Sequence, residues 1–427
     1  MNNKKIFPFL LLAGTLLTAG STNTQAQQTL TKEISQEVPS QKGSLIRLVS
    51  TARKVTIKPW DQAKVKVTVE LVYDTAIPRK NRTDAEWFED MGINIKPFSN
   101  RVDILTGASV SGVSSLPLKT VTVAGYRQQN PIKRKGEKGD VIVEGYRSGT
   151  PKEIIVKGFA AKPAIRVMTI LVPAGCKLDL ENKYGDVSIG MNVDEAKLEI
   201  TNGALDAQDI KDLKLVGNYC NANLGNIEKA EVEFTNGTFR AQNINDLDMD
   251  SKSSTIEYEK GSYLYIRSQA DHFSIDAIDK VDGRKVYGSI KIDQLNNSFD
   301  LEGNNVDIKF RNIGQDVSLI RINNKYGDVR LPVKNLKNYY VDFIGNYSTV
   351  FASFQKEVVK EEEKKEGEGD AAVKEAGQAV TVTRYKIGTT SAVGEVAPRH
   401  FTSANGDTKG KHTRIELTCH SCTVDFK

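Results

Sequence analysis

Residues 196–213 read AKLEITNGALDAQDIKDL, and residues 230–247 read AEVEFTNGTFRAQNINDL. Ten of the eighteen positions are identical between these stretches, which lie 34 residues apart. The segment between them keeps the same alternation of apolar and polar residues, so the spacing of 34 corresponds to two units of about 17. A repeat of this length is typical of architectures in which each unit packs on its neighbours.

Each unit reads as two short strands joined by a turn. In residues 196–213, Leu198 and Ile200 alternate with polar residues before Asn202-Gly203, and a second alternation follows that pair. A period of two indicates strands that are buried on one face. Asn-Gly accepts the left-handed backbone of a tight turn.

The hexapeptide NKYGDV occurs at 182–187 and again at 324–329. We interpret it as a turn whose tyrosine packs inward. An alternative is a calcium ladder through Asp186 and Asp328, because oxygen-rich turns bind calcium.

The repeats predict an all-β chain, folded as a single β-helix or β-solenoid of rungs of about 17–20 residues with a small helical cap near the N-terminus. A sandwich or barrel also fits alternating strands. The many near-copies at short period favour the solenoid, since a rung buries its apolar face only by stacking. We expect a signal peptide at 1–26, N-terminal rungs with the capping helix at 27–105, a basic Gly/Ser-rich insertion at 106–162, a central β-solenoid at 163–357, an acidic low-complexity loop at 358–412 and a terminal rung at 413–427.

The N-terminus predicts export. Lys4 and Lys5 precede an apolar run at 7–17, which is shorter than the ~20 residues that span a bilayer. Thr24-Gln25-Ala26 offers small residues for cleavage, so the mature chain would start near Gln27. No transmembrane anchor is predicted, and the expected location is the periplasm, the outer-membrane surface or the extracellular space.

Residues 83–91, TDAEWFEDM, interrupt the strand pattern. Thr83 or Asp84 would cap a short helix that places Trp87, Phe88 and Met91 on one face. Such a helix would protect an exposed strand edge.

The two predicted insertions differ in charge. Residues 106–162 hold ten Lys or Arg against four Asp or Glu, which fits a solvated insertion or a loop that grips an acidic polymer. Residues 361–370, EEEKKEGEGD, are of low complexity. The whole chain has 59 basic and 54 acidic residues, and this balance with no reader motif argues against nucleic-acid binding.

Cys419-His420-Ser421-Cys422 is the sharpest local motif. Cys419 takes the place that Asn182 holds in the hexapeptide, and Cys422 takes that of Gly185. In an oxidising compartment a local disulfide between Cys419 and Cys422 is the simplest interpretation. The alternatives are free thiols with a structural role, no role, a zinc site with His412, and a redox role.

No catalytic residue, cofactor or metal site is predicted. Four acidic residues are available on outer faces, as on any solvated solenoid: Asp206, Asp209, Asp248 and Asp250. The four histidines are scattered: His272, His400, His412 and His420. No phosphate loop or nucleophile elbow occurs.

Two stretches resemble a family of exported bacterial adhesin-like repeat proteins. The first is Val55-x-Ile57-x-x-Trp60-Asp61, and the second runs from Val172-Pro173 to Val187. The resemblance covers about 44–105 and 165–357 with the last rung. It implies a β-solenoid exported by Gram-negative bacteria, without catalytic residues.

These features predict a non-enzymatic envelope or surface protein, adhesin-like or scaffolding, that binds through a solenoid surface. Its partner would be a glycan, an envelope component or another surface protein. Two alternatives stay open: a periplasmic accessory of an envelope signalling system, and a polysaccharide-active enzyme on a β-helix, which rests on fold analogy.

Overall fold

The computed structural model describes residues 29–74, 83–106, 132–135, 141–147, 150–156, 164–362, 381–387, 395–396 and 399–427. The predicted signal peptide at 1–26 lies outside these residues. So do most of the predicted basic insertion and much of the predicted acidic loop.

The described chain is nearly all β, with almost no helix. Twenty-two strands form one open sheet, and β7, β8 and β9 form a separate sheet of three. The strands are β1 (Thr29–Pro39), β2 (Leu45–Thr51), β3 (Lys54–Trp60), β4 (Lys64–Asp74), β5 (Ile93–Pro97), β6 (Arg101–Thr106), β7 (Ile132–Lys135), β8 (Val141–Arg147), β9 (Thr150–Val156), β10 (Ala164–Pro173), β11 (Lys177–Lys183), β12 (Val187–Ile189), β13 (Val193–Ala207), β14 (Ile210–Leu224), β15 (Ile227–Thr235), β16 (Thr238–Lys252), β17 (Thr255–Ile313), β18 (Leu319–Arg330), β19 (Tyr339–Asn346), β20 (Thr349–Ala352), β21 (Lys356–Glu362), β22 (Thr381–Ile387), β23 (Glu395–Val396), β24 (His400–Asn405) and β25 (Thr413–Phe426). The helices are α1 (Asp84–Asp90) and the short 3-10 turn η1 (Val333–Asn335).

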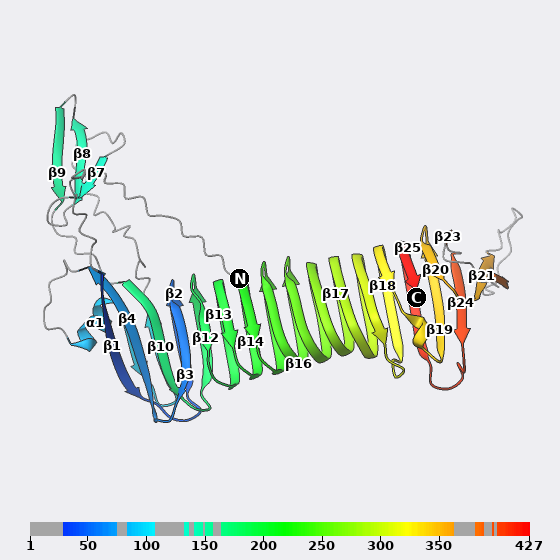
Figure 1. The fold of residues 1–427 in the computed structure, drawn as a ribbon, viewed down its shortest axis with the longest axis horizontal. Coiled ribbons are helices and arrows are strands. Elements are labelled where there is room, and N and C mark those ends of the chain that lie inside the picture. The colour runs from blue at the N-terminus through cyan, green and yellow to red at the C-terminus, as the bar shows by residue number, and fades with distance from the viewer. Residues whose placement is uncertain are drawn as a thin grey trace, which may run out of the picture.

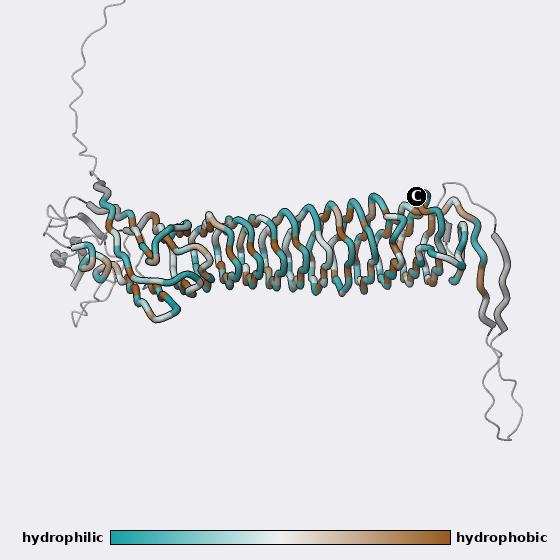
Figure 2. Tube along the Cα trace, turned by 90° about the horizontal axis from the view of Figure 1, so that it is seen from below, coloured by the Kyte–Doolittle hydropathy of each residue, from teal (hydrophilic) through white to brown (hydrophobic). Residues whose placement is uncertain are grey.

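The central strands pair in parallel at a constant offset. Leu198 pairs with Leu215, Leu215 with Val232, and Val232 with Met249, each step being 17 residues. We call one such 17-residue unit a coil. Successive coils lie side by side along the long axis of the molecule (Figure 1), and the wound trace has a regular pitch (Figure 2). The paired apolar side chains stack in buried columns, and each contributes about 1.5–3 kcal/mol by leaving water.

Each coil turns at one residue other than glycine with positive φ, and these residues align in a column that we call the left-handed corner. In spatial order along the sheet they are Ala52, Tyr184, Asn202, Tyr219, Asn236, Ser253, Ala270, Tyr287, Asn305, Tyr326, Ser421 and Tyr347. A left-handed residue other than glycine costs about 1–3 kcal/mol. The column is therefore strained wherever a bulky side chain occupies it.

The prediction that the hexapeptide tyrosines pack inward is wrong. Tyr184 and Tyr326 are both exposed. Strand alternation would place the residue after Lys183 inside, but the positive φ of Tyr184 breaks the alternation and turns its ring outward. Asn182 is the inward residue, and its Nδ2 donates to the carbonyl oxygens of Gly185 at 2.7 Å and Arg53 at 3.3 Å.

The residue after the corner lies against the neighbouring coil. A Cβ added at Gly203 would collide with the carbonyl oxygen of Gly185, and one added at Gly237 would collide with that of Cys220. These two glycines allow the close approach because they have no side chain, whereas Cys220 holds the same position in the coil between them.

The C-terminal strand does not end the sheet, contrary to the expectation of a terminal rung at 413–427. β25 pairs in parallel with β18 on one side and with β19 and β20 on the other. Its core residue Leu417 lies opposite Ile322 and Phe343. The chain thus leaves a gap after β18 and fills it with its last strand, while β24 and β21 lie further out.

The N-terminal region adds antiparallel pairing. β4 pairs with β1 and with β10, and β10 also pairs in parallel with β3. Helix α1 starts at a capping box between Thr83 and Glu86 and buries Trp87 and Phe88. No helix among the described residues is long and apolar enough to cross a membrane.

Candidate functional site

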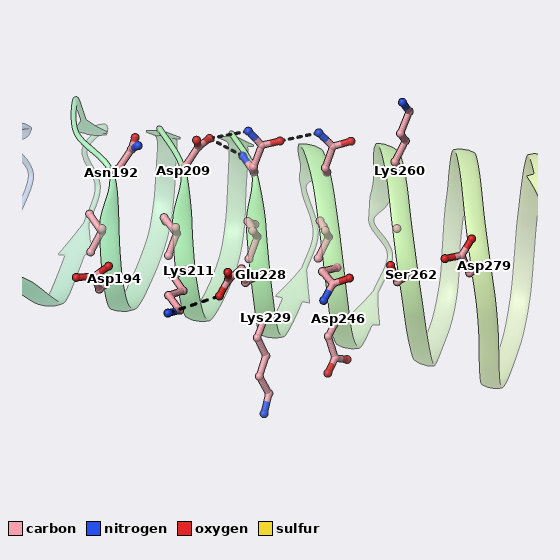
Figure 3. Close-up of a pocket in the computed structure, with 18 of the residues that line it drawn as sticks. Asn192, Asp194, Asp209, Lys211, Glu228, Lys229, Asp246, Lys260, Ser262 and Asp279 are labelled. Carbon is pink, nitrogen blue, oxygen red and sulfur yellow. Dashed lines mark hydrogen bonds and ion pairs between the residues drawn. The ribbon is translucent and has the colours of Figure 1, made fainter.

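A long groove follows the second turn of the central coils, at the other end of each short strand from the left-handed corner. It has a volume of about 1240 Å³ and runs across the coils from Asn192 to Asn296. Buried apolar side chains at consecutive coils form its floor: Val193, Ile210, Ile227 and Ile244. Figure 3 shows the lining side chains repeated from one strand to the next.

One edge of the groove is a ladder of amide and carboxylate groups. Asp209 Oδ1 accepts hydrogen bonds from the backbone N–H of Asn226 at 2.8 Å and from its Nδ2 at 2.9 Å. Asn226 Oδ1 in turn accepts from Asn243 Nδ2 at 2.6 Å (Figure 3). These bonds hold equivalent side chains in fixed positions and leave further donors and acceptors for a partner.

The other edge carries both signs of charge. Asp194, Lys211 and Glu228 occupy the same position of successive coils, and Lys211 and Glu228 form an ion pair of 3.9 Å. Further along, Asn296 Nδ2 donates to Asp279 at 2.9 Å. Mixed charge of this kind does not favour a polyanion, because the attraction of the lysines is offset by the neighbouring carboxylates.

The acidic residues singled out from the sequence do not converge. Asp209 lines the groove. Asp206 lies outside it and accepts a hydrogen bond from Asn223 of the neighbouring coil at 3.0 Å. Asp248 and Asp250 both bind Arg267, at 2.8 and 3.4 Å. Their carboxylates serve contacts between coils.

The histidines also lie apart. His272 contacts Ser289, His400 contacts Asp342, and His412 contacts the carbonyl oxygen of Gly410. Within the described part of the chain, no three His, Cys, Asp or Glu side chains are placed to hold a metal ion.

A buried polar network, which the sequence analysis missed, lies inside the stack. Lys285 is fully buried, and its Nζ donates to Ser268 Oγ at 3.0 Å and to the carbonyl oxygen of Asp271 at 2.7 Å. The Asp271 carboxylate accepts from Ser251, Ser254 and Ser268 at 2.5–2.8 Å. Burial lowers the pKa of Lys285 to about 8, although Asp271 acts to raise it.

A serine beside a lysine of lowered pKa is an arrangement found in nucleophilic catalysis. Here Lys285 and Asp271 have no exposed surface, so a substrate cannot reach them. The network instead satisfies polar groups that replace apolar ones in the core. The signal for it in the sequence was weak, since its members are spread over residues 251–285 among other polar residues.

The terminal cysteines lie together inside the C-terminal coils. Cys419 and Cys422 are buried free thiols in contact with each other, and Cys422 Sγ lies 3.3 Å from the carbonyl oxygen of Asn324. The hydrogen bond with Cys422 and burial raise the pKa of Cys419. Cys419 pairs with Asn324, and Cys422 pairs with Gly327, which are the hexapeptide positions expected from the sequence.

Comparisons with known proteins add little to this geometry. No protein-family model matches the chain, and no curated protein matches it. A solved structure of a "putative cell adhesion protein" from Clostridium sporogenes is similar over 93% of this chain and 100% of its own, with 9% identity and a TM-score of 0.19. A likeness that low supports no argument about function.

Proposed function

We propose that this chain is an exported, non-enzymatic envelope or surface protein that binds an extended partner along a β-solenoid. In this proposal the coils are solenoid rungs and α1 covers the N-terminal end of the stack. The resemblance to exported adhesin-like proteins and the signal-like N-terminus support export.

The groove is the observation that carries the proposal. It presents mostly polar side chains at matching positions of successive coils, and the Asp209–Asn226–Asn243 ladder holds three of them in register. A partner with its own repeat would meet hydrogen-bonding groups at a regular spacing along the groove. Repeat proteins use extended surfaces of this kind for binding.

The test is a binding screen with the chain starting at Gln27 on glycan arrays, matrix proteins and envelope fractions. We expect the chain to retain a component of one of these sets. Asn226→Ala combined with Asn243→Ala should weaken retention at the groove. Asn223→Ala is the matched control, because Asn223 also bonds across coils but lies outside the groove. Retention of no component would contradict the proposal.

We also propose that Cys419 and Cys422 form a disulfide in the exported protein. The contact between the two thiols supports this proposal. Both S–H bonds break as the S–S bond forms, and a disulfide oxidant of the exported compartment takes up the two electrons and two protons. Mass spectrometry of protein isolated without reductant should show a mass lower by two hydrogen atoms. The full thiol mass, or bound zinc, would contradict this.

A further inference from the structure

The left-handed corner carries a row of exposed aromatic rings. Seven large apolar or aromatic side chains are exposed among the residues whose burial is described, and five are tyrosines of this one column. Their exposed fractions are 63% for Tyr184, 61% for Tyr219, 50% for Tyr287, 50% for Tyr326 and 84% for Tyr347.

Nothing in the backbone calls for tyrosine at these positions. A bulky residue is disfavoured at positive φ, where glycine and asparagine are preferred. Asn202, Asn236 and Asn305 occupy the same column in neighbouring coils. The tyrosine rings also stay outside the core, so the reason for them lies in what they present to solvent.

The tyrosines are periodic. In spatial order they occur at every second coil, and Ser253 stands at the only second-coil position within the row that lacks one. With strands ~4.8 Å apart, two coils span roughly 9.6 Å. The rings therefore form platforms at this spacing along one edge of the stack, with one gap at Ser253.

The row is densest at its C-terminal end. His420 lies between Tyr326 and Tyr347, with ring centroids 5.8 Å from each. Because β25 is inserted between β18 and β19, three consecutive coils there carry an aromatic ring.

Charged groups of both signs flank two of the rings. Lys183 precedes Tyr184, and Asp186 follows it by two residues; Lys325 and Asp328 flank Tyr326 in the same way. Lysine and aspartate beside the same ring offer hydrogen bonds of both kinds without a net charge. Single-stranded nucleic acid also stacks on aromatic rings, but it needs a positively charged path, which the aspartates interrupt.

We propose that the left-handed corner binds an extended, neutral, β-linked polysaccharide, with sugar faces stacked on the tyrosines. Tyrosine supplies a rigid amphipathic surface, and the flanking side chains suit the hydroxyl groups at the sugar edges. One sugar of an extended chain is about as long as the ~4.8 Å strand spacing, so each disaccharide meets one tyrosine. The corner is separate from the groove, so this inference adds a second binding surface to the proposed function.

The experiment measures calorimetric affinity for β-1,4-linked glucose oligomers, from disaccharide to octasaccharide. Affinity should rise with length, because longer chains span more rings. Tyr326→Asn and Tyr347→Asn should each lower affinity for the octasaccharide about threefold to tenfold. They should also preserve or raise the melting temperature, since asparagine is the cheaper residue at this corner. Phe98→Asn is the control, because Phe98 is a comparably exposed aromatic residue outside the column.

A second variant adds a platform. Ser253→Tyr completes the two-coil spacing between Tyr219 and Tyr287, so it should tighten octasaccharide binding and leave disaccharide binding unchanged. A thermal melt confirms that the variant folds.

Three results would overturn the inference. One is octasaccharide binding that the Tyr→Asn variants leave unchanged. Another is binding of single-stranded DNA or a proline-rich peptide in place of the glucose oligomers. The third is absence of glucose-oligomer binding by a chain that retains an envelope component in the screen above, which would leave the proposed function standing. A chain that binds nothing in either experiment would contradict both proposals.

Discussion

The centre and the C-terminal end of the sheet are built by opposite rules. In the centre, neighbours in space are neighbours in sequence, and Leu198, Leu215 and Val232 follow one another at intervals of 17 residues. At the C-terminal end, Ile322 pairs with Leu417, 95 residues away, and Leu417 pairs back to Phe343. The stability of the central coils should therefore depend on contacts between sequence neighbours. The stability of the C-terminal end should depend on β25, the last strand of the chain.

Removal of β25 should give the largest effect. A chain that stops at His412 leaves β18 and β19 without their common partner. Hydrogen exchange should show loss of protection from β18 onward, while β13–β16 stay protected, because stacked repeats unfold in local units. Removal of Lys427 alone is the control. Equal loss of protection in β13–β16 would contradict the distinction between the two regions.

Gly237→Ala should destabilise the central coils, with a smaller effect than removal of β25. The added methyl group meets the carbonyl oxygen of Cys220 in the next coil, and the backbones must separate. We expect a loss of about 3 kcal/mol in the free energy of unfolding. Gly190→Ala is the matched control, because its Cβ would meet Ile57 O at an ordinary 3.5 Å. Equal urea denaturation of the two variants would show that the close approach is unimportant.

Lys285 should make the free energy of unfolding of the central coils depend on pH. Its pKa lies near 8 in the folded state, below its ordinary 10.5, so the unfolded chain binds more protons between these values. Stability should therefore rise with pH through this window, by up to about 3 kcal/mol. The measurement is the difference in unfolding free energy between the wild type and Lys285→Met from pH 7 to 11. A difference that does not change with pH would rule out the lowered pKa.

The smallest effect should come from the ion pairs between coils. Arg240 Nε binds Glu257 at 2.7 Å on the exposed surface. Exposed pairs contribute little because water and salt screen them. Arg240→Gln should leave the urea midpoint almost unchanged, and a large shift would mean that surface pairs hold the coils together.

The same comparison explains what could be predicted from the sequence. The repeats predicted the strands and turns of the central coils. Strands that pair at an offset of 17 residues carry similar residues at that fixed spacing. The position of β25 between β18 and β19 could not be predicted in this way. The sequence pattern of a strand is the same whether the strand lies between two others or ends the sheet. The antiparallel pairing of β10 with β4 was also hidden, because it repeats no residues at a fixed spacing.

The candidate sites followed a similar division. The place of Cys419 and Cys422 at hexapeptide positions was confirmed by the pairing of β25 with β18. The outward turn of Tyr184 was missed, because alternation alone does not reveal a positive φ at the corner. Once the corner is known, the tyrosines at every second coil can be found in the sequence.

The most direct test of the central claim is antibody labelling of intact cells that produce the protein, compared with permeabilised cells. We expect antibodies against the central coils to label intact cells, and the mature N-terminus to lie near Gln27. Labelling only after permeabilisation, with residues 1–26 retained, would contradict an exported surface protein.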